Sequence, residues 1–316
     1  MKRILIVQIG RIGDMVLTTP VFDALAERFP EAELHLLASP KGAPVAAHDP
    51  RIARIHLHRK GVAGLVSSIL ALRRERFDVW VDPKDHPSTE GALLARWSGA
   101  PRRIGFNAEG SRAFTETVPS DRENVSLHAV ERNLLALRTL GIERRGIVRP
   151  SLYIEKSAEE AVERDLNGAA APAVVNISAG QATRRWKEEG WSAVIRYCFG
   201  KGMDVALAFQ PSDAERAAAF KREFPRLIVP GSPGIGHAAA LVKRAALVVT
   251  VDTAVVHLAS AFDIPVVALY TNVPWNFAKF RPLSTRQEVL MSSEAESLLS
   301  VTAEAVVLKM EQLQQR

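Results

Sequence analysis

The chain has 316 residues, of which 47% are hydrophobic and 24% charged, and a formal net charge of +6. This length predicts two domains, and the composition is typical of a globular protein and excludes a disordered one. No apolar run approaches the ~20 residues of a membrane-spanning helix, and the run that follows Met1 is too short for a signal peptide. A single cysteine, Cys198, excludes an intrachain disulfide and a cysteine metal cluster. We therefore expect a cytoplasmic protein.

The positive charge is partly gathered in arginine clusters at 73–76, 102–103 and 144–149. A basic surface suits nucleic acid, anionic lipid headgroups or a phosphorylated substrate. Arginines that simply solvate helix ends and loops explain any one cluster equally well. Because no helix-turn-helix, zinc finger or aromatic RNA-binding motif accompanies them, we expect no nucleic-acid partner.

The first half of the chain alternates strand-like and helix-like segments. Strands are expected at 3–9, 33–37, 55–57, 77–81 and 102–105. The first helix ends at Phe29-Pro30, and its start is open. It begins either at Thr19-Pro20, which has the form of an N-cap followed by proline, or earlier, with Met15 already helical. A helix over 126–140 is expected to end at Gly141, a typical left-handed cap.

The second half repeats this alternation. Strands are expected at 173–177, 205–209, 227–229, 247–251 and 265–270, with helices that include 158–166, 212–224 and 237–244. Alternating strands and helices imply parallel sheets covered on both faces, and hence an α/β fold. We expect domains of 1–155 and 156–316, and a C-terminal helix, 302–313, that packs on either domain or on a partner.

Gly10-Arg11-Ile12-Gly13-Asp14 follows the first strand. The glycines allow a tight turn and bring backbone N–H groups close to a ligand. The spacing is not that of a dinucleotide fingerprint or a phosphate-binding P-loop. Asp14 either caps the following helix or, exposed at the end of the strand, accepts a proton from a hydroxyl. The residues by themselves favour the cap.

Asp252-Thr253-Ala254-Val255-Val256-His257 follows a second β-branched run. A helix that begins near Thr253 directs unpaired N–H groups and its positive dipole end at the strand ends, where phosphate binds. Asp252 is itself anionic and suits ligand hydroxyls or helix capping better. His257 reaches either phosphate or its helix neighbours, and on an apolar helix it is more often a core residue.

A third segment, Ser178-Ala179-Gly180, is followed by three cations, Arg184, Arg185 and Lys187. Small residues at a strand end followed by cations favour a pyrophosphate cradle, and a solvated basic loop is an equally good interpretation. The mixed ligands of 82–86 have the wrong spacing for a metal site, so we expect no metal.

Taken together, these segments resemble the heptosyltransferase family, bacterial GT-B enzymes that transfer heptose from ADP-heptose to the lipopolysaccharide core. The resemblance runs through five blocks, 4–20, 77–82, 93–106, 184–191 and 249–270. The first and last blocks are specific in combination. The chain differs from the family pattern in having Arg184 for the usual lysine, Ala254 for glycine, and Thr271-Asn272-Val273 for Gly-Pro-Thr.

The resemblance implies a metal-independent, inverting transfer without a cofactor, in a cleft between two Rossmann-like domains. The N-terminal domain then holds an anionic glycolipid acceptor and the C-terminal domain a nucleotide sugar. Asp14 matches the general base that deprotonates the acceptor hydroxyl. The further residues assigned to the acceptor are Arg11, Gly13 and Arg103. A basic surface would contact the inner membrane transiently, without insertion.

The donor site follows from the same resemblance. Asp252 matches the residue that holds the hydroxyls of the donor sugar, and His257 matches the histidine beside the phosphates. The N–H groups of Thr253 and Ala254 would stabilise the leaving diphosphate. The remaining donor residues are Ser178, Gly180, Arg184 and Lys187.

Two other functions stay open. A nucleotide-sugar epimerase of GT-B architecture would consume its nucleotide sugar with no acceptor present. A non-catalytic saccharide-binding relative, with a donor site altered at Ala254 and Thr271-Asn272, would show no turnover with any donor.

Overall fold

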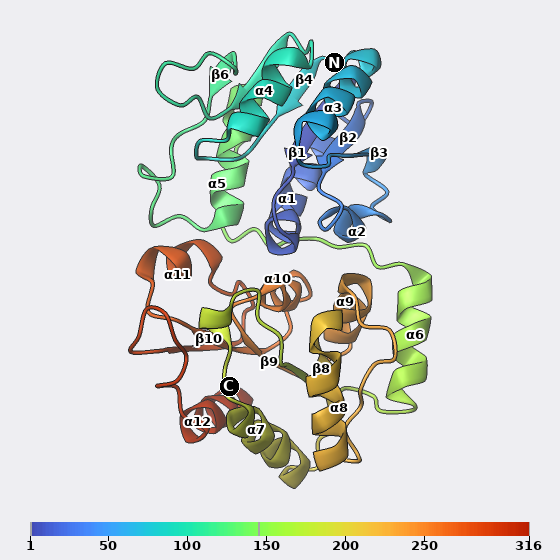
Figure 1. Cartoon of the computed structure of the whole chain (residues 1–316), viewed down its shortest axis with the longest axis vertical. Coiled ribbons are helices and arrows are strands. Elements are labelled where there is room, and N and C mark those ends of the chain that lie inside the picture. The colour runs from blue at the N-terminus through green and yellow to red at the C-terminus, as the bar shows by residue number, and fades with distance from the viewer. Residues whose placement is uncertain (1, 145, 316) are drawn as a thin grey trace. The chain divides into compact units, whose positions relative to one another are not determined.

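The computed structural model describes residues 2–144 and 146–315, and the chain divides into two compact units, Met1–Tyr153 and Ile154–Arg316. Each unit is built on one parallel sheet covered by helices (Figure 1). Both sheets are rich in buried β-branched strands, because parallel strands covered on both faces have no polar side. Among the described residues, no helix has the length and apolar character needed to cross a membrane.

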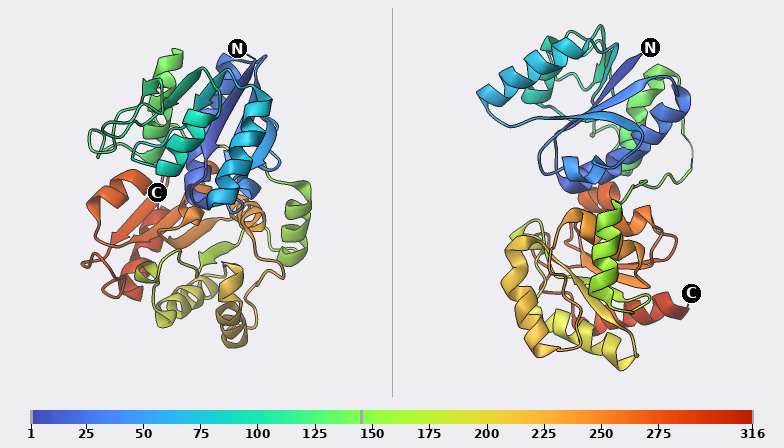
Figure 2. Two further views of the ribbon diagram at one scale, coloured as in Figure 1. Left: turned by 45° about the horizontal axis from the view of Figure 1, so that its top comes forward. Right: turned by 90° about the vertical axis from the view of Figure 1, so that its right-hand side faces the viewer.

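The first unit contains six parallel strands in the order β3-β2-β1-β4-β5-β6. The strands are β1 (Arg3–Gln8), β2 (Glu33–Ala38), β3 (Ile52–Leu57), β4 (Val79–Val81), β5 (Arg102–Gly105) and β6 (Glu116–Thr117). The helices are α1 (Ile12–Arg28), α2 (Ala43–Ala46), α3 (Val62–Glu75), α4 (Thr89–Trp97) and α5 (Ala129–Leu135). Helices α3 and α4 lie together on one face of the sheet, and α1 and α5 lie together on the other (Figure 1 and Figure 2).

The second unit contains five parallel strands in the order β11-β10-β9-β7-β8. The strands are β7 (Ala173–Asn176), β8 (Val205–Ala208), β9 (Leu247–Val251), β10 (Val266–Tyr270) and β11 (Gln287–Met291). The helices are α6 (Lys156–Leu166), α7 (Glu188–Gly200), α8 (Ala214–Glu223), α9 (Ile235–Lys243), α10 (Ala254–Ala261), α11 (Pro274–Phe280) and α12 (Ala303–Gln315). Every residue of β9 and β10 is buried.

The C-terminal helix α12 packs within the second unit, against α7, β10 and β11. Its apolar stripe of Val306, Met310 and Leu313 is fully buried in the core that also contains Trp186 and Trp191. The two tryptophan rings meet edge to face at 4.9 Å. Of the places expected for this helix, its own unit therefore covers the stripe of Val306, Met310 and Leu313.

Helix α1 begins at Ile12, so the earlier of the two expected starts, with Met15 already helical, is confirmed and Pro20 lies inside the helix. A proline in a helix leaves the carbonyl four residues earlier without its usual N–H partner. Here the Thr19 hydroxyl donates to that carbonyl, Val16 O, at 2.9 Å. This local replacement explains why the helix continues through Pro20 to Arg28, with Phe29 as its C-cap as predicted.

One further helix start and one predicted strand differ from the structure. The helix expected from 126 begins at Ala129, because the His128 ring accepts the Val130 N–H and forms the N-cap. Its last turn, Ala136–Leu140, is a 3-10 helix, and Gly141 (φ +72°) ends it as predicted. The segment 227–229 is not a strand: Ile228 makes one isolated bridge to Ala206, in a stretch bounded by two prolines that is too short to extend the sheet.

Candidate active site

The loop between β1 and α1 is held in one conformation by side chains at both of its ends. Gln8 accepts the Gly10 N–H at 3.0 Å and donates to the Thr18 hydroxyl at 2.8 Å. The Ser39 hydroxyl donates to Gly10 O at 2.9 Å. A Cβ at Gly10 would lie 2.7 Å from Gln8 Oε1 and 2.9 Å from Asp14 Oδ2, so a larger residue there would displace these two side-chain ends. Gly10 therefore permits a close turn, as predicted, and the groups that it approaches are the side chains of Gln8 and Asp14.

Asp14 lies in the first turn of α1, directly after this loop. Its Oδ2 accepts the Arg11 N–H at 3.0 Å, so Asp14 caps its own helix. Its Oδ1 has no hydrogen bond from the described residues, and the residue is only half-buried. A carboxylate has acceptor positions on both oxygens. The cap and the proton acceptor are thus compatible roles, because the cap orients the carboxylate through one oxygen and the other accepts no bond from the described residues.

The other residues assigned to the acceptor are placed differently. Arg11 is exposed at the N-cap of α1, and Gly13 lies within the first turn of the same helix. Arg103 lies far from this loop: the strand register aligns it with Trp80 and Leu5, in the middle of the sheet. Its guanidinium donates to Ala113 O and Ala100 O, both at 2.7 Å. The structure therefore gives Arg103 a structural role instead of bringing it together with Asp14.

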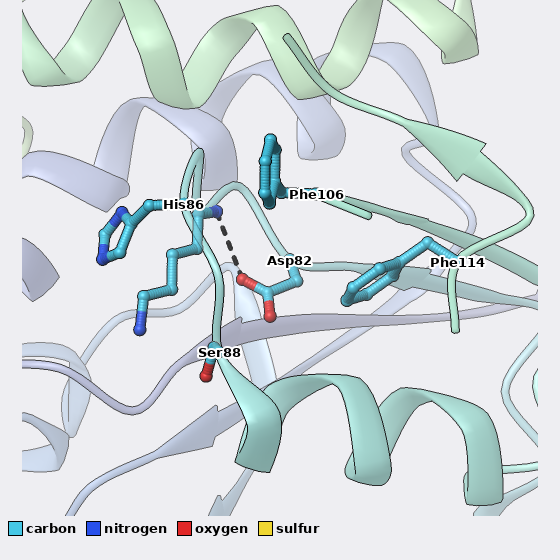
Figure 3. Close-up of a pocket in the computed structure, with 6 residues that line it drawn as sticks. Asp82, His86, Ser88, Phe106 and Phe114 are labelled. Carbon is cyan, nitrogen blue, oxygen red and sulfur yellow. Dashed lines mark hydrogen bonds between the residues drawn. The ribbon is translucent and has the colours of Figure 1, made fainter. Parts of the chain in front are cut away.

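Asp82 is a buried carboxyl of the first unit with a raised pKa. It follows β4, the strand beside β1, and is 5% exposed. Figure 3 shows it in a small cavity of ≈ 10 Å³ lined also by Lys84, His86, Ser88, Phe106 and Phe114. Its Oδ1 accepts the Lys84 N–H at 3.2 Å. Burial raises the pKa of Asp82 to about 6, although this hydrogen bond and the charges of Lys84 and His86 oppose the shift.

A carboxyl kept buried despite its preference for water is typical of functional sites. From the sequence we weighed the segment 82–86 as a metal site and did not predict the burial or the raised pKa of Asp82. Its position after a predicted strand was the available signal. Within the described ranges 2–144 and 146–315, no three His, Cys, Asp or Glu side chains are grouped so as to hold a metal ion.

In the second unit, Asp252 lies at the end of β9 in a closed triangle of polar side chains. Its Oδ2 accepts from Asn276 Nδ2 at 2.7 Å and lies 3.1 Å from Arg184 Nη1. Arg184 Nη2 in turn donates to Asn276 Oδ1 at 3.1 Å. Asp252 is 4% exposed, so Arg184 supplies the charge that makes this burial tolerable. Arg184, which was predicted to bind phosphate, forms an ion pair with Asp252 in this structure.

Helix α10 begins as predicted beside this triangle. Thr253 is its N-cap and accepts the Val255 N–H at 3.3 Å. Asn176, at the end of β7, donates to the Thr253 hydroxyl at 3.0 Å and to the Thr250 hydroxyl at 2.9 Å. Ala254 is the first helical residue. Unpaired N–H groups at such a helix start favour the binding of an anion. Because Asp252 is paired with Arg184, its negative charge repels such an anion less.

His257 lies one turn into α10 and is 4% exposed. Its ring centroid is 6.1 Å from that of Phe280. His257 is therefore buried as a core residue would be, which is one of its two expected interpretations. Its predicted place beside phosphate stays a prediction.

The segment after β7 contains one buried hydrogen-bond network. Ser178 donates to Asp213 Oδ2 at 2.5 Å and accepts the Gln210 N–H at 2.8 Å. Burial opposes ionisation of Asp213, but its bonds from Ser178 and Arg216 hold its pKa below the ordinary value. The Ser178 hydroxyl thus both donates and accepts hydrogen bonds within the protein itself. A Cβ at Gly180 would meet nothing within 4 Å, so this position is open, and Lys187 precedes α7, half-buried.

Sequence reasoning missed the polar residues that support the predicted ones. Asn276, Asn176 and Asp213 each orient a predicted residue, and all three are buried. Asn176 and Asp213 follow or end predicted strands, a signal that sequence analysis could have used. Asn276 lies in α11, which the apolar pattern did not indicate.

Comparison with known proteins identifies the family. The model of glycosyltransferase family 9 (heptosyltransferase) matches residues 66–309. Lipopolysaccharide heptosyltransferase 3 of Escherichia coli K12 is 27% identical over 279 residues, which cover 82% of this chain and 79% of the relative.

Solved structures share the fold. The glycosyl transferase family 9 protein from Veillonella parvula superposes with a TM-score of 0.86 at 21% identity, over 99% of this chain and 97% of that one. The E. coli ADP-heptose lps heptosyltransferase II superposes with a TM-score of 0.81 at 20% identity, over 100% and 99%. The predicted fold class, two Rossmann-like parallel-sheet domains of GT-B type, is confirmed. The chain therefore belongs to glycosyltransferase family 9, the heptosyltransferases.

Proposed function

We propose that this glycosyltransferase moves heptose, or a related sugar, from an ADP-sugar to a lipopolysaccharide core acceptor, with inversion and without a metal ion. The observation that carries the proposal is the half-buried Asp14 carboxylate, which is fixed through Oδ2 by its own helix and has no hydrogen bond from the described residues at Oδ1. The related E. coli structure is described as an ADP-heptose enzyme, which supports the choice of donor. The first unit would hold the acceptor and the second the donor.

Asp14 acts as the general base. It takes the proton of the acceptor hydroxyl while that oxygen forms a bond to the anomeric carbon and the bond from this carbon to the diphosphate breaks. A single displacement from the side opposite the diphosphate inverts the configuration. The Arg11 N–H bond keeps the carboxylate in one orientation during this step. A positioned base of this kind contributes roughly 10²–10⁴-fold to rate.

The start of α10 stabilises the leaving ADP. N–H groups aimed at a developing negative charge do the work that a divalent cation does in other transferases. The Arg184–Asp252–Asn276 triangle fixes Asp252 at the same edge, where its carboxylate accepts bonds from the donor sugar.

Substitution of Asp14 by Asn tests the base directly. Asparagine keeps an oxygen for the Arg11 N–H, so the helix cap and the fold survive, but the basicity is lost. We expect kcat to fall by roughly 10²–10⁴-fold with donor binding nearly intact. Asp14→Ala is the companion variant, which loses the cap as well and about 1 kcal/mol of stability. Transfer by Asp14→Asn at the parental rate would show that Asp14 is not the base.

A thermal-shift screen of nucleotide sugars tests the donor. A ligand at about 100 times its dissociation constant adds about 2.7 kcal/mol to the free energy of unfolding. We expect a shift with ADP-sugars and none with UDP- or GDP-sugars. Transfer should continue in EDTA. Consumption of donor without acceptor would instead indicate the epimerase, and binding without turnover the non-catalytic relative.

A further inference from the structure

The outer face of α3 and α4 exposes a double stripe of apolar side chains. On α3, Val62, Val66 and Leu70 recur every four residues and are 81%, 50% and 55% exposed. On α4, Leu93 and Trp97 share the same spacing and are 38% and 52% exposed. Residues four apart lie on one side of a helix. Since α3 and α4 contact each other on one face of the sheet (Figure 1), the two stripes lie on neighbouring helices, and we call them together the α3–α4 surface.

Exposed cations lie on these two helices and directly before and after α3. They are Arg59, Lys60, Arg73, Arg74, Arg76 and Arg96. None of the six forms a salt bridge with the described residues, whereas the two acidic residues of these segments do: Glu75 pairs with Arg3 and Arg54, and Glu90 with His58. The apolar stripe therefore has uncompensated positive charge beside it.

The surface also starts at the edge of the sheet that carries Asp14. Helix α3 follows the carboxyl end of β3 and α4 that of β4, while Asp14 follows the carboxyl end of β1, and all three strands are parallel. Val62, with Arg59 and Lys60 just before it, is thus at the same edge as the proposed base.

We propose that this α3–α4 surface docks on an anionic lipid bilayer, with its apolar stripe at the headgroup level and its cations on lipid phosphates. The positive charge of the surface indicates this partner, because an apolar stripe with unpaired cations beside it is complementary to anionic headgroups. The inference rests on the proposed function for its purpose, which is to present the base to an acceptor anchored in the membrane.

Vesicle binding tests the charge. Purified full-length protein is sedimented with vesicles of phosphatidylglycerol and phosphatidylcholine, and with phosphatidylcholine alone. We expect binding only to the anionic vesicles, weakened by salt. Arg59→Gln with Lys60→Gln should lower the partition coefficient by about fivefold per cation, or about 25-fold together. The matched control, Arg164→Gln with Arg222→Gln on exposed helices of the second unit, should change it little.

Tryptophan fluorescence tests insertion. Trp80, Trp186 and Trp191 are buried, and of the five tryptophans only Trp97 and Trp275 are exposed. Anionic vesicles should shift the emission of the Trp275→Phe variant to shorter wavelength and leave that of Trp97→Phe unshifted. For the aliphatic stripe, Val66→Ser with Leu70→Ser should weaken vesicle binding, whereas Leu299→Ser with Leu308→Ser should not.

Failure of the docking proposal is distinguishable from failure of the proposed function, because vesicle binding needs neither donor nor acceptor. If the enzyme transfers sugar to a deacylated acceptor but the face variants bind vesicles like the parent, the docking proposal is wrong. It is also overturned if those variants change only the molar mass in sedimentation, since the face would then be a protein interface.

Discussion

Replacement of Asp82 by Asn should stabilise the protein at neutral pH. The carboxyl is buried beside Phe106 and Phe114, and removal of water from its charged form raises its pKa from 3.8 to about 6. Asparagine keeps an oxygen for the Lys84 N–H and has no charge to bury. The Ser88 hydroxyl lines the same cavity.

The size and pH dependence follow from the pKa. A shift of about 2 units corresponds to about 3 kcal/mol, since one unit is 1.36 kcal/mol. Below pH ~4 both folded and unfolded states are protonated at Asp82, so the group has no effect on stability. Between pH ~4 and ~6 the unfolded state loses its proton first, and the parental free energy of unfolding falls. Above pH ~6 the loss is complete, and the variant should be more stable by about 3 kcal/mol.

Urea denaturation of both proteins across this pH range measures the difference. A suitable control is Asp78→Asn, because bonds from the Lys2 and Arg3 N–H groups hold the pKa of Asp78 below its ordinary value. That variant should be destabilised at neutral pH and should approach the parent as pH falls. An Asp82→Asn variant that is no more stable than the parent at pH 7.5, or equally stabilised at pH 4, would refute the reasoning.

Three further substitutions probe the second unit. Arg184→Ala leaves Asp252 buried without its cation and should cost about 3 kcal/mol in urea denaturation, with Arg184→Lys recovering part of it. Gly190→Ala places a Cβ 2.6 Å from the Trp186 ring and should lower stability by roughly 1–3 kcal/mol, seen as a lower Tm; an unchanged Tm would mean that the ring moves freely. Thr253→Ala removes the N-cap of α10 and should cost about 1 kcal/mol and weaken nucleotide binding in calorimetry, whereas Thr253→Ser should retain both.

Much of the fold was predictable from local patterns. Continuous β-branched runs such as 247–251 indicate strands buried on both faces, and these strands appear at the predicted places. The start of α10 at Thr253 and the end of the segment at Gly141 were also predictable, because a hydroxyl cap and a left-handed glycine act within one turn of the chain. The strand β11 was missed, because its residues lack a clear apolar run.

The candidate site was predicted only in outline. Asp14 and Asp252 could be located because each follows a recognisable strand, but their surroundings could not. The Asp14 carboxylate accepts the Arg11 N–H through one oxygen, and the sequence contains no information on that geometry. Arg103, assigned to the acceptor through the family resemblance, donates to two backbone carbonyls, and nothing in the sequence indicated these partners.

The sequence by itself determined most of the order of strands and helices, some helix ends such as those at Thr253 and Gly141, and the positions of the two carboxylates, since each depends on residues a few positions apart. The tertiary structure decided the partners of those groups. Arg184 meets Asp252 across 68 positions and Asn276 across 92, and Ser178 meets Asp213 across 35. Such pairs form only when a parallel sheet brings the carboxyl ends of separate strands to one edge, and packing, not local pattern, fixes which side chains then meet.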